Sequence, residues 1–434
     1  MLKATISKQK QDKERLLARP YVIRTKEQDA QKWISSDLAK VILGPRRAGK
    51  SVFALMLLKD RDFAYFNFDD ESLPEEGNGK IDLDELMAEL KLAYGDTKYI
   101  LFDEIQNLPR WELFVNRLHR AGYNLVITGS NAQLLSKELA THLTGRHIPI
   151  EIMPFDFKEV LKAKRYEVSV EKLLLPDEKG KLFGIINQYM VNGGYPEVVT
   201  KELEPRGYLD VLFDAVLFKD IIKRHKVRFA EQISNLGSFL MNNFASLYGP
   251  KRLADILGFK SQVTLENYLN YLTEAYLIFS LRRYSTKTSQ RLRAPKKIYV
   301  VDNGFITGKA VQHSPNNGKL MENLVFTELV KQGFQPNREI FYYTTKNDRE
   351  VDFVLKDGYK VTELIQVAYD STGSAVEERE VKALIEAGKE LFASGGKFPK
   401  LTVVTWNEKR EVEKDGLTIR FKPLWEWLLE GVTV

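Results

Sequence analysis

Short apolar runs alternate with segments of helical periodicity over the first third of the chain. Runs of strand length occupy residues 40–43, 63–69, 98–104 and 123–130. Between them, apolar residues recur at the spacing of amphipathic helices. Strands that alternate with helices pair in parallel, because each helical crossover returns the chain to the same end of the sheet. The pattern therefore predicts a parallel, doubly wound α/β sheet over residues 1–154.

The pattern changes twice further along the chain. From about residue 155 the β runs disappear and Leu, Lys, Glu and Phe recur at helical spacing, which predicts a helical lid or connector. Three helical segments and a β run then predict a winged helix, and mixed strands and helices after it predict a separate α/β domain. The expected boundaries are 1–154 for the first sheet, 155–226 for the helical lid, 227–296 for the winged helix and 297–434 for the last domain.

The amino-acid composition excludes several classes of site and of cellular location. At 434 residues the chain is too long for a single core, and its formal net charge of +6 permits a polyanionic partner without requiring one. The chain has no cysteine, which excludes disulfides, thiolate metal sites and cysteine nucleophiles, and only five histidines. Its first residues contain no apolar core of a signal peptide, and no apolar run reaches about 18 residues. We therefore expect a cytoplasmic protein without a membrane partner.

A glycine-rich loop stands between the first apolar run and the helical segment that follows it. Its sequence, GPRRAGKS, fits the pattern GxxxxGK[ST]. In such a loop the backbone N–H groups face phosphate, the lysine meets the β and γ phosphates, and the hydroxyl holds Mg²⁺. The strand before it and the helix after it distinguish it from an ordinary glycine turn. We expect ATP to contact Gly44, Arg46, Arg47, Ala48, Gly49, Lys50, Ser51 and Val52.

An acidic pair ends the third apolar run, YILFDE. A strand that ends in a carboxylate after such a loop is typical of a Walker B motif, in which the acid stands beside Mg²⁺. Asp103 is expected to bind the metal together with Ser51. Glu104 is expected to polarise the attacking water as a general base. ATP and Mg²⁺ are therefore the expected cofactors.

Polar residues end the fourth apolar run. Thr128, Gly129, Ser130 and Asn131 stand where a γ-phosphate sensor belongs, and Asn131 is the residue expected to act. The same stretch suits the N-cap of the following helix, so both interpretations remain open.

Arg146 lies beyond that helix. It is expected to neutralise transition-state charge, in its own subunit or in a neighbour's, and an ordinary surface arginine is the alternative.

These motifs resemble a family. GPRRAGKS, YILFDEIQNL, ITGSN and the Gly-Arg pair that precedes an apolar strand and PFDF are similar to the archaeal and bacterial AAA+-type ATPases related to the STAND group, whose C-terminal part is a nuclease-like (PD-(D/E)xK-fold, DUF4143-type) domain. The resemblance extends over nearly the whole chain. It implies that Gly194-Tyr195-Pro196 matches an element that approaches the adenine, with Pro196 as the contact. Pro196 as a simple helix breaker is the alternative.

A basic run follows the predicted helices of the winged helix. Seven Lys and Arg and no acidic residue occur between positions 281 and 297. In a winged helix this stretch is the wing, which commonly lies on the phosphate backbone. Packing or subunit contacts are the alternative. The residues expected at DNA are Arg282, Arg283, Lys287, Arg291 and Arg293; a second basic group upstream comprises Lys219, Lys223, Arg224, His225, Lys226 and Arg228.

The last domain is similar to PD-(D/E)xK nucleases in its outline. Glu322 on a helix and Asp352 in a hairpin match the first two carboxylates. The strand that carries Glu-x-Lys in the relatives has Gln366 and Ala368 instead, and Glu363 falls on the opposite face of that strand. Without the third carboxylate and the lysine, we expect no cleavage of DNA.

Two functional hypotheses follow. The first is an ATP-hydrolysing, DNA-binding AAA+-type ATPase, with branched DNA in recombination or repair as its substrate and with a homo-oligomeric assembly. The second is a STAND-like switch or scaffold that binds ATP, hydrolyses it slowly and recruits protein partners. Salt-dependent binding of DNA distinguishes the two hypotheses.

Overall fold

A computed structural model gives the structure of the chain, and it describes residues 2–73, 81–130, 145–309, 316–370, 374–392 and 398–432. The chain divides into two compact units. Unit 1 comprises Met1–Phe155 and Glu274–Tyr276, and unit 2 comprises Asp156–Thr273 and Leu277–Val434. Apart from Phe155 and Glu274–Tyr276, the lid, the winged-helix region and the last domain expected from the sequence fall within unit 2.

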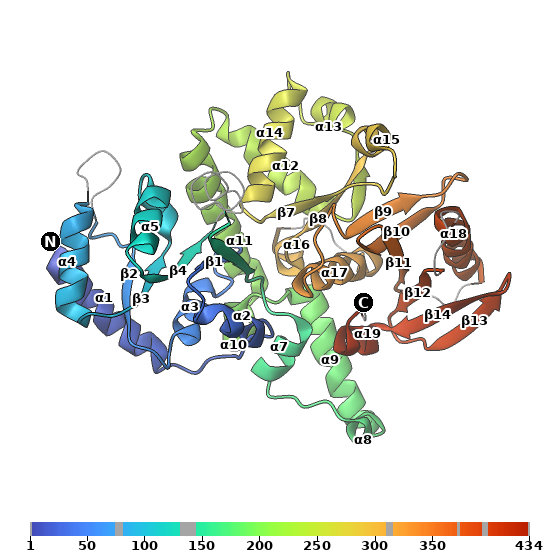
Figure 1. Cartoon of the computed structure of the whole chain (residues 1–434). Coiled ribbons are helices and arrows are strands. Elements are labelled where there is room, and N and C mark those ends of the chain that lie inside the picture. The colour runs from blue at the N-terminus through green and yellow to red at the C-terminus, as the bar shows by residue number, and fades with distance from the viewer. Residues whose placement is uncertain are drawn as a thin grey trace. The chain divides into compact units, whose positions relative to one another are not determined.

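Unit 1 is built on a five-stranded parallel sheet with the strand order β2-β3-β4-β1-β5 (Figure 1). The strands are β1 (Ala39–Leu43), β2 (Phe63–Asn67), β3 (Tyr99–Asp103), β4 (Asn124–Gly129) and β5 (His147–Glu151). All five residues of β1 and all six of β4 are buried, as expected for strands covered on both faces. The predicted parallel α/β sheet is confirmed.

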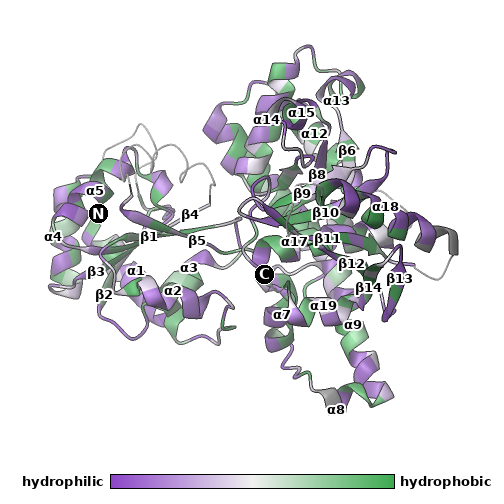
Figure 2. Cartoon of the chain, turned by 45° about the vertical axis from the view of Figure 1, so that its right-hand side comes forward, coloured by the Kyte–Doolittle hydropathy of each residue, from purple (hydrophilic) through white to green (hydrophobic). Residues whose placement is uncertain are grey.

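Helices cover both faces of this sheet. They are α1 (Leu2–Leu17), α2 (Glu27–Ile34), α3 (Lys50–Leu57), α4 (Leu83–Tyr94) and α5 (Trp111–Arg120). α2 and α3 pack on one face, and α4 and α5 pack on the other. α5 buries Trp111, Phe114, Val115 and Leu118, which recur at helical spacing on one side. Figure 2 shows the resulting mixture of hydrophobic and hydrophilic residues along the helices.

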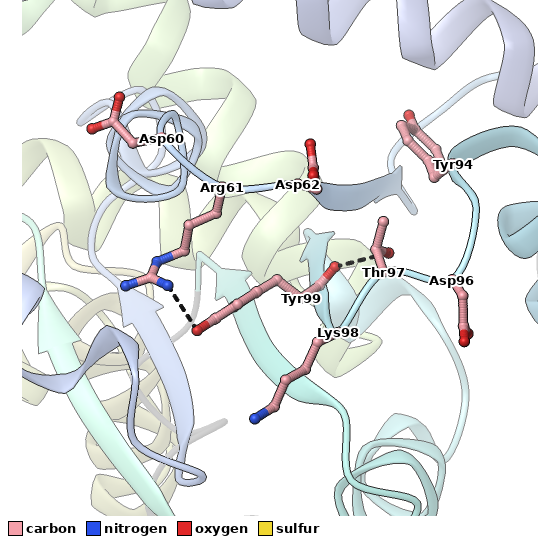
Figure 3. Close-up of a pocket in the computed structure, with 8 residues that line it drawn as sticks. All are labelled: Asp60, Arg61, Asp62, Tyr94, Asp96, Thr97, Lys98 and Tyr99. Atoms are coloured by element: carbon pink, nitrogen blue, oxygen red, sulfur yellow. Dashed lines mark hydrogen bonds between the residues drawn. The ribbon is translucent and has the colours of Figure 1, made fainter.

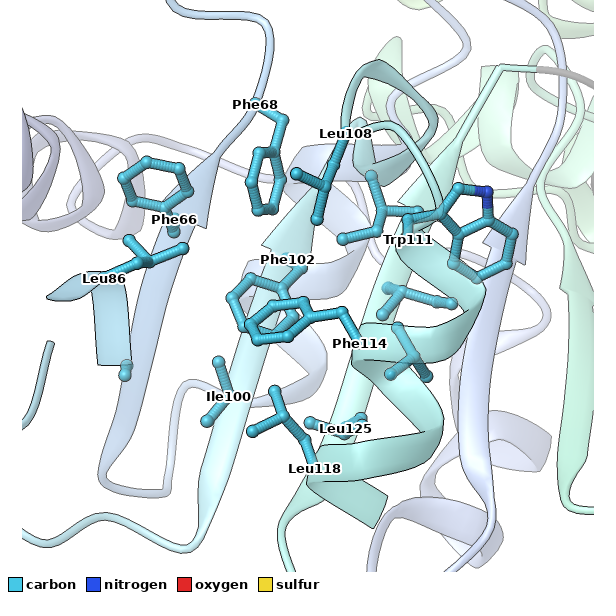
Figure 4. Close-up of a cluster of buried hydrophobic side chains, with 14 of the residues drawn as sticks. Phe66, Phe68, Leu86, Ile100, Phe102, Leu108, Trp111, Phe114, Leu118 and Leu125 are labelled. Carbon is cyan, nitrogen blue, oxygen red and sulfur yellow. The ribbon is translucent and has the colours of Figure 1, made fainter. Parts of the chain in front are cut away.

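Aromatic rings fill the core under α5. Phe68 lies between Phe66 and Phe102, with ring centroids 4.8 and 5.7 Å apart, and Phe102 lies 5.4 Å from Phe114 (Figure 4). Each large ring buries much apolar surface, and tilted or edge-on contacts suit its charge distribution. This packing holds β2 and β3 against α5, so the end of β3 has a defined position.

The first helix protects an edge of the sheet. The side-chain amide of Gln9 in α1 exchanges two hydrogen bonds with the backbone of Asn67, accepting from its N–H at 2.9 Å and donating to its carbonyl at 3.0 Å. β2 is one of the two edge strands of this sheet, and an edge strand with free backbone groups can pair with another chain. The basic N-terminal segment is therefore part of the folded core.

Unit 2 begins with helices, as the sequence predicts. They are α7 (Phe157–Ala163), α8 (Val170–Leu173), α9 (Pro176–Asn192), α10 (Pro196–Lys201), α11 (Pro205–Ala215) and a π-helical segment at Val216–Lys223. Asp156 caps α7: its carboxylate accepts from the Glu159 N–H, and the Glu159 carboxylate accepts from the Asp156 N–H. In the part of the chain that the structure describes, no helix combines the length and the apolar character of a membrane span.

A small sheet joins the next elements. Their order is α12 (Ala230–Asn242), β6 (Ser246–Tyr248), α13 (Pro250–Ile256), α14 (Gln262–Glu274), β7 (Ile278–Leu281), α15 (Thr288–Arg293) and β8 (Lys296–Val300). β8 pairs antiparallel with both β6 and β7. The boundary expected at residue 296 therefore divides a strand, because β8 completes this sheet through partners that precede it in the chain.

The C-terminal part holds a six-stranded mixed sheet with the strand order β13-β14-β12-β11-β10-β9. Its elements are α16 (Asn303–Lys309), α17 (Asn317–Lys331), β9 (Ile340–Thr344), β10 (Glu350–Asp357), β11 (Lys360–Ala368), α18 (Ser374–Phe392), β12 (Lys400–Thr405), β13 (Arg410–Lys414), β14 (Leu417–Pro423) and α19 (Leu424–Glu430). The apolar pattern of the sequence predicts a helix at 318–331, strands at 339–344, 350–355 and 362–367, a helix at 376–391 and a strand at 401–406. These correspond to the elements from α17 to β12, whereas the sequence pattern does not predict β13, β14 and α19.

A buried asparagine links α17 to the end of β8 and to the residues that follow it. Asn323 donates to the carbonyl of Val300 at 2.9 Å and to Asn303 Oδ1 at 2.8 Å, and it accepts from the Val300 N–H at 2.8 Å. Its side chain is fully buried. Replacing it removes three hydrogen bonds at once and leaves buried polar groups without partners.

We therefore expect Asn323→Ala to lower the free energy of unfolding by about 3 kcal/mol, because each unsatisfied buried group is costly. Urea denaturation followed by circular dichroism measures the change. Asn270→Ala is the matched control, since Asn270 lies exposed on α14. Equal stabilities of the two variants would contradict the role given to Asn323.

Candidate functional site

The glycine-rich loop connects β1 to α3 at the carboxyl edge of the sheet. Gly44, Arg47 and Gly49 have positive φ angles of 139°, 65° and 93°. A Cβ atom on Gly44 would lie 1.9 Å from the carbonyl oxygen of Ile152, because the backbone after β5 runs directly beside the loop. Only glycine fits this position. The loop therefore has the tight backbone turn that the sequence pattern requires.

Lys50 is the first residue of α3 and is almost fully buried. Its ammonium group donates to the carbonyl of Pro45 at 3.0 Å and lies 3.9 Å from Glu104 Oε1. The side chain thus folds back over the loop toward the end of β3. This places a positive charge between the loop and the acidic pair.

The carboxylate of Asp103 lies at the centre of the site. Its Oδ1 accepts from the Ser51 hydroxyl at 2.9 Å and from the Thr128 hydroxyl, and its Oδ2 accepts from the Tyr65 hydroxyl at 3.3 Å. Burial, followed by the nearby charge of Glu104, raises the pKa of Asp103, and the two hydroxyl hydrogen bonds to Oδ1 and Lys50 oppose that rise. A buried acid surrounded mainly by neutral donors favours a bound cation.

Glu104 lies beside Asp103 in a left-handed backbone conformation, with φ of 49°. Its N–H donates to the Thr128 hydroxyl at 3.0 Å. Its carboxylate accepts from the side-chain amide of Gln106, which also lies 3.3 Å from the Ser130 hydroxyl. The conformation turns the Glu104 side chain away from the strand direction and toward Lys50.

Tyr65, Thr128, Gln106 and Arg24 also contribute to this arrangement. The sequence pattern predicts no role for Tyr65, Gln106 and Arg24. Arg24 donates to the Ala48 carbonyl at 3.0 Å and to the Met153 carbonyl at 2.5 Å, which ties the loop to the end of β5. Thr128 lies within the polar stretch that the sequence singled out, so that stretch was a usable signal. Tyr65 was detectable only as a polar group in an apolar strand, and Arg24 had no sequence signal.

The remaining residues expected at the nucleotide have varied surroundings. Arg46 lies 3.5 Å from Asp69 Oδ2, Arg47 is exposed, Ala48 is buried and Val52 is half-buried. Asn131, the residue expected to act as the sensor, lies outside the described residues. β4, whose end carries that polar stretch, does pair with both β1 and β3, and thus lies between the two Walker motifs.

Arg146 lies near the amino ends of the parallel strands, whereas the glycine-rich loop lies at their carboxyl ends. Arg146 directly precedes β5, and His147 pairs with Ala39 at the start of β1. The loop follows the other end of β1, about 16 Å away at the usual rise of a strand. The exposed Arg146 side chain does not span that distance. Of the two roles expected for Arg146, action within its own subunit is therefore incompatible with this position.

A surface cavity of about 580 Å³ lies at the amino ends of β2 and β3 (Figure 3). Arg61 crosses it and donates to the Tyr99 hydroxyl at 3.0 Å. Its other lining residues are Asp60, Asp62, Tyr94, Asp96, Thr97 and Lys98. Because the strands are parallel, this cavity is at the opposite edge from the glycine-rich loop, and it is separate from the site above.

Pro196 belongs to unit 2, where it begins α10. The preceding glycines pack on a buried carboxylate: the Gly194 N–H donates to Asp302 Oδ2 at 2.8 Å, and a Cβ atom on Gly193 would lie 1.6 Å from Asp302 Oδ1. This contact explains Gly193 by local packing, because any larger side chain would overlap the Asp302 carboxylate. The adenine contact of Pro196 stays a prediction.

The basic run is partly used inside unit 2. The Arg283 guanidinium donates to the Thr344 carbonyl at 2.6 Å. The backbone on either side of Arg283 bonds to Tyr342: the Tyr342 N–H donates to the Arg282 carbonyl, and the Tyr284 N–H donates to the Tyr342 carbonyl. Lys297 is buried among carboxylates. The exposed basic surface is therefore smaller than expected. Lys287 and Arg293 are exposed and Arg291 is half-buried, around α15.

The residues expected from the nuclease outline do come together. Glu322 on α17 and Asp352 on β10 both contact Lys297, and Gln366 on β11 accepts from the Asp352 N–H at 3.2 Å. Glu363 instead accepts from the Thr402 hydroxyl at 2.5 Å, consistent with the opposite face of β11. The sequence predicts that this cluster lacks a lysine, and that prediction is wrong. Lys297 reaches the cluster from β8, a strand distant in sequence.

Comparisons with known proteins agree with the fold. A family model described as AAA domain matches residues 36–161, and two models described as domains of unknown function, DUF8612 and DUF4143, match residues 184–313 and 317–426. An uncharacterized protein of Methanocaldococcus jannaschii is 38% identical over 405 residues, covering 90% of this chain and 88% of that protein. An uncharacterized Haemophilus influenzae protein is 29% identical, covering 91% of this chain and 95% of that protein.

Solved structures show weaker likeness. A Walker-type ATPase of Pyrococcus abyssi is 19% identical with a TM-score of 0.40, covering 68% of this chain and 99% of that one. A STAND protein with a tetratricopeptide repeat sensor from Pyrococcus horikoshii is 15% identical with a TM-score of 0.27, covering 72% of this chain and 46% of that one.

The loop, the acidic pair and the strand order define unit 1 as a P-loop ATPase domain of the AAA type. The chain belongs to the same family as the M. jannaschii protein. The AAA-type core and the DUF4143 region expected from the sequence are thereby confirmed.

Two substitutions distinguish the roles of Lys50 and Glu104. We expect Lys50→Ala to weaken ATP binding, because it removes the charge expected at the β and γ phosphates. We expect Glu104→Gln to retain binding and to slow hydrolysis by about 10²-fold or more, because the amide does not accept a proton from water. Equilibrium binding of a fluorescent ATP analogue and single-turnover hydrolysis measure the two effects. Unchanged turnover in Glu104→Gln would exclude it as the base.

Proposed function

We propose that unit 1 binds ATP with Mg²⁺ and hydrolyses it. The observation that carries this proposal is the convergence of Ser51, Asp103 and Glu104 beside the buried Lys50. A hydroxyl and a carboxylate are ligands that suit Mg²⁺, so these residues fit the ion. Bound Mg²⁺ supplies positive charge to the phosphate oxygens.

The residues of the chain have separate roles in this proposal. The backbone of the loop cradles phosphate, and Gly44 and Gly49 allow its conformation. Lys50 stabilises negative charge on the β and γ phosphates. Ser51 and Asp103 hold the metal, and Thr128 and Tyr65 orient the Asp103 carboxylate. Glu104 takes the proton of the attacking water, and Gln106 orients Glu104.

We further propose that the region from α12 to β8 is a winged helix that binds DNA. The order of helices and strands, and the pairing of β8 between β6 and β7, support this assignment. α14 presents Gln262, Asn267 and Asn270 to solvent, and such side chains position or read bases. All six residues of α15 are exposed or half-buried, so its basic residues are accessible. Branched DNA is the substrate we propose.

The internal contacts of the basic run favour a second function, that of a nucleotide-dependent switch or scaffold. Arg283 and Lys297 are held by internal partners, which lowers the charge left for phosphate. A nucleotide-dependent switch or scaffold with protein partners needs no basic surface. The two functions differ in their response to salt, because neutralised phosphates release counterions.

We expect the triple variant Lys287→Ala, Arg291→Ala, Arg293→Ala to weaken binding to all DNA sequences. The slope of log affinity against log salt should fall by about 0.9 for each lost contact. Fluorescence anisotropy with duplex, single-stranded and branched DNA, with and without ATP, measures both quantities.

A triple variant at Lys389, Lys409 and Arg420 is the control, since these side chains are 53%, 68% and 63% exposed in the C-terminal part. It removes the same net charge at another place. Equal effects of the two triple variants would favour the switch or scaffold over the DNA-binding function.

We also propose that Arg146 acts on the nucleotide of a neighbouring copy. Mixing Arg146→Ala protein with Lys50→Ala protein should then restore part of the ATPase activity that each variant lacks, because one interface combines an intact loop with an intact arginine. Steady-state phosphate release measures the recovery. A fully active monomer, shown by light scattering at the assay concentration, would contradict the proposal.

A further inference from the structure

Lys297 is a buried cation with three carboxylate partners. Its ammonium nitrogen lies 2.6 Å from Glu322 Oε1, 2.6 Å from Glu350 Oε1 and 3.1 Å from Asp352 Oδ1. Only 3% of its side chain is exposed. An ammonium group has three N–H donors, so these three oxygens use its full donor capacity. The cluster brings together β8, α17 and β10, which lie close together in Figure 1.

The nuclease-like outline implies a divalent cation between Glu322, Asp352 and a third acid, and the residues present do not fit one. Asp352 Oδ1 contacts Lys297, and Asp352 Oδ2 accepts from the Val367 N–H at 2.9 Å. Glu322 Oε1 also accepts from the Tyr299 hydroxyl at 2.7 Å. The position of the third acid holds Gln366, a neutral side chain. A divalent cation at these oxygens would have to displace a buried ammonium.

We propose that Lys297 takes the place of a divalent cation, so that its ammonium group holds the carboxylates together and closes the cluster to metal. Unpaired buried carboxylates would repel one another, and a positive charge among them removes that repulsion. Lys297 also ties β8 of the small sheet to α17 and β10 of the C-terminal part. The position at which the outline implies a metal is thereby a structural contact.

The titration behaviour of Glu322 agrees with this arrangement. Burial raises the pKa of Glu322 to about 7, with Lys297 opposing the rise and Asp352 adding to it. One ammonium among three carboxylates leaves excess negative charge, which disfavours the charged form of Glu322.

Binding of Mn²⁺ in the absence of nucleotide tests the proposal. Free Mn²⁺ is measured by electron paramagnetic resonance in titrations of the wild type, Asp352→Asn and Lys297→Met. We expect Asp352→Asn to leave Mn²⁺ binding of the wild type unchanged. We expect Lys297→Met to gain one Mn²⁺ site. Its affinity should be at least about tenfold higher than that of any Asp352-dependent site in the wild type, and the double variant Lys297→Met, Asp352→Asn should lose it.

Asp348→Asn is the matched control, since Asp348 lies exposed in the turn before β10 and outside the cluster. A site in the wild type that Asp352→Asn removes would overturn the proposal, and so would a folded Lys297→Met protein that gains none. Because Lys297→Met leaves the three acids without a donor, Lys297→Gln serves as a second variant, since its neutral amide still offers two N–H donors. The wild-type comparison does not depend on the folding of either one.

The rival role for Lys297 is catalytic, and a cleavage assay distinguishes it. Linear and branched DNA are incubated with Mg²⁺ or Mn²⁺, with and without ATP. We expect the wild type to leave both intact. Metal-dependent cutting by the wild type that Lys297→Met abolishes would overturn the proposal and make the cluster a functional nuclease centre.

Discussion

The pairing of β4 with β1 on one side and with β3 on the other is the constraint on which the nucleotide site depends. Parallel pairing aligns the carboxyl ends of all three strands, so the loop after β1, Asp103 at the end of β3 and Thr128 in β4 meet at one edge. A shift of one residue in either pairing would turn the polar side chains to the other face of the sheet. Helices cover both faces of β1 and β4, so the shift would also move every packed apolar side chain to the opposite face, where its volume has no matching space.

The buried carboxylates of the two units have different kinds of partner. In unit 1, hydroxyl groups of Ser51, Thr128 and Tyr65 donate to Asp103, and these donors carry no charge. In unit 2, the ammonium of Lys297 contacts Asp352 directly and compensates its charge. A buried charge is tolerated only with such partners. The nature of the partner therefore separates an acid that suits Mg²⁺ from an acid that is already neutralised.

The sequence predicted the sheet of unit 1 well, because its signals are local. Each strand is an apolar run, and the alternation with helices implies parallel pairing. It also predicted α17, β9 to β11, α18 and β12. It missed β13, β14 and α19, and its boundary at residue 296 divided β8. The residues of β8 gain their strand partners from β6 and β7, which lie earlier in the chain, and a local pattern does not contain that pairing.

The sequence by itself determined the residues of the glycine-rich loop and the acidic pair, because a loop of fixed length between a strand and a helix has its chemistry written in consecutive positions. Only the tertiary structure decided which distant residues complete each site. Tyr65 and Thr128 reach Asp103 across neighbouring strands, and Arg146 is separated from the loop by the length of a strand. Lys297, part of a basic run in the sequence, is buried among acids because β8 packs against α17 and β10. Charge along a chain does not reveal burial, since burial depends on elements that meet only in the folded protein.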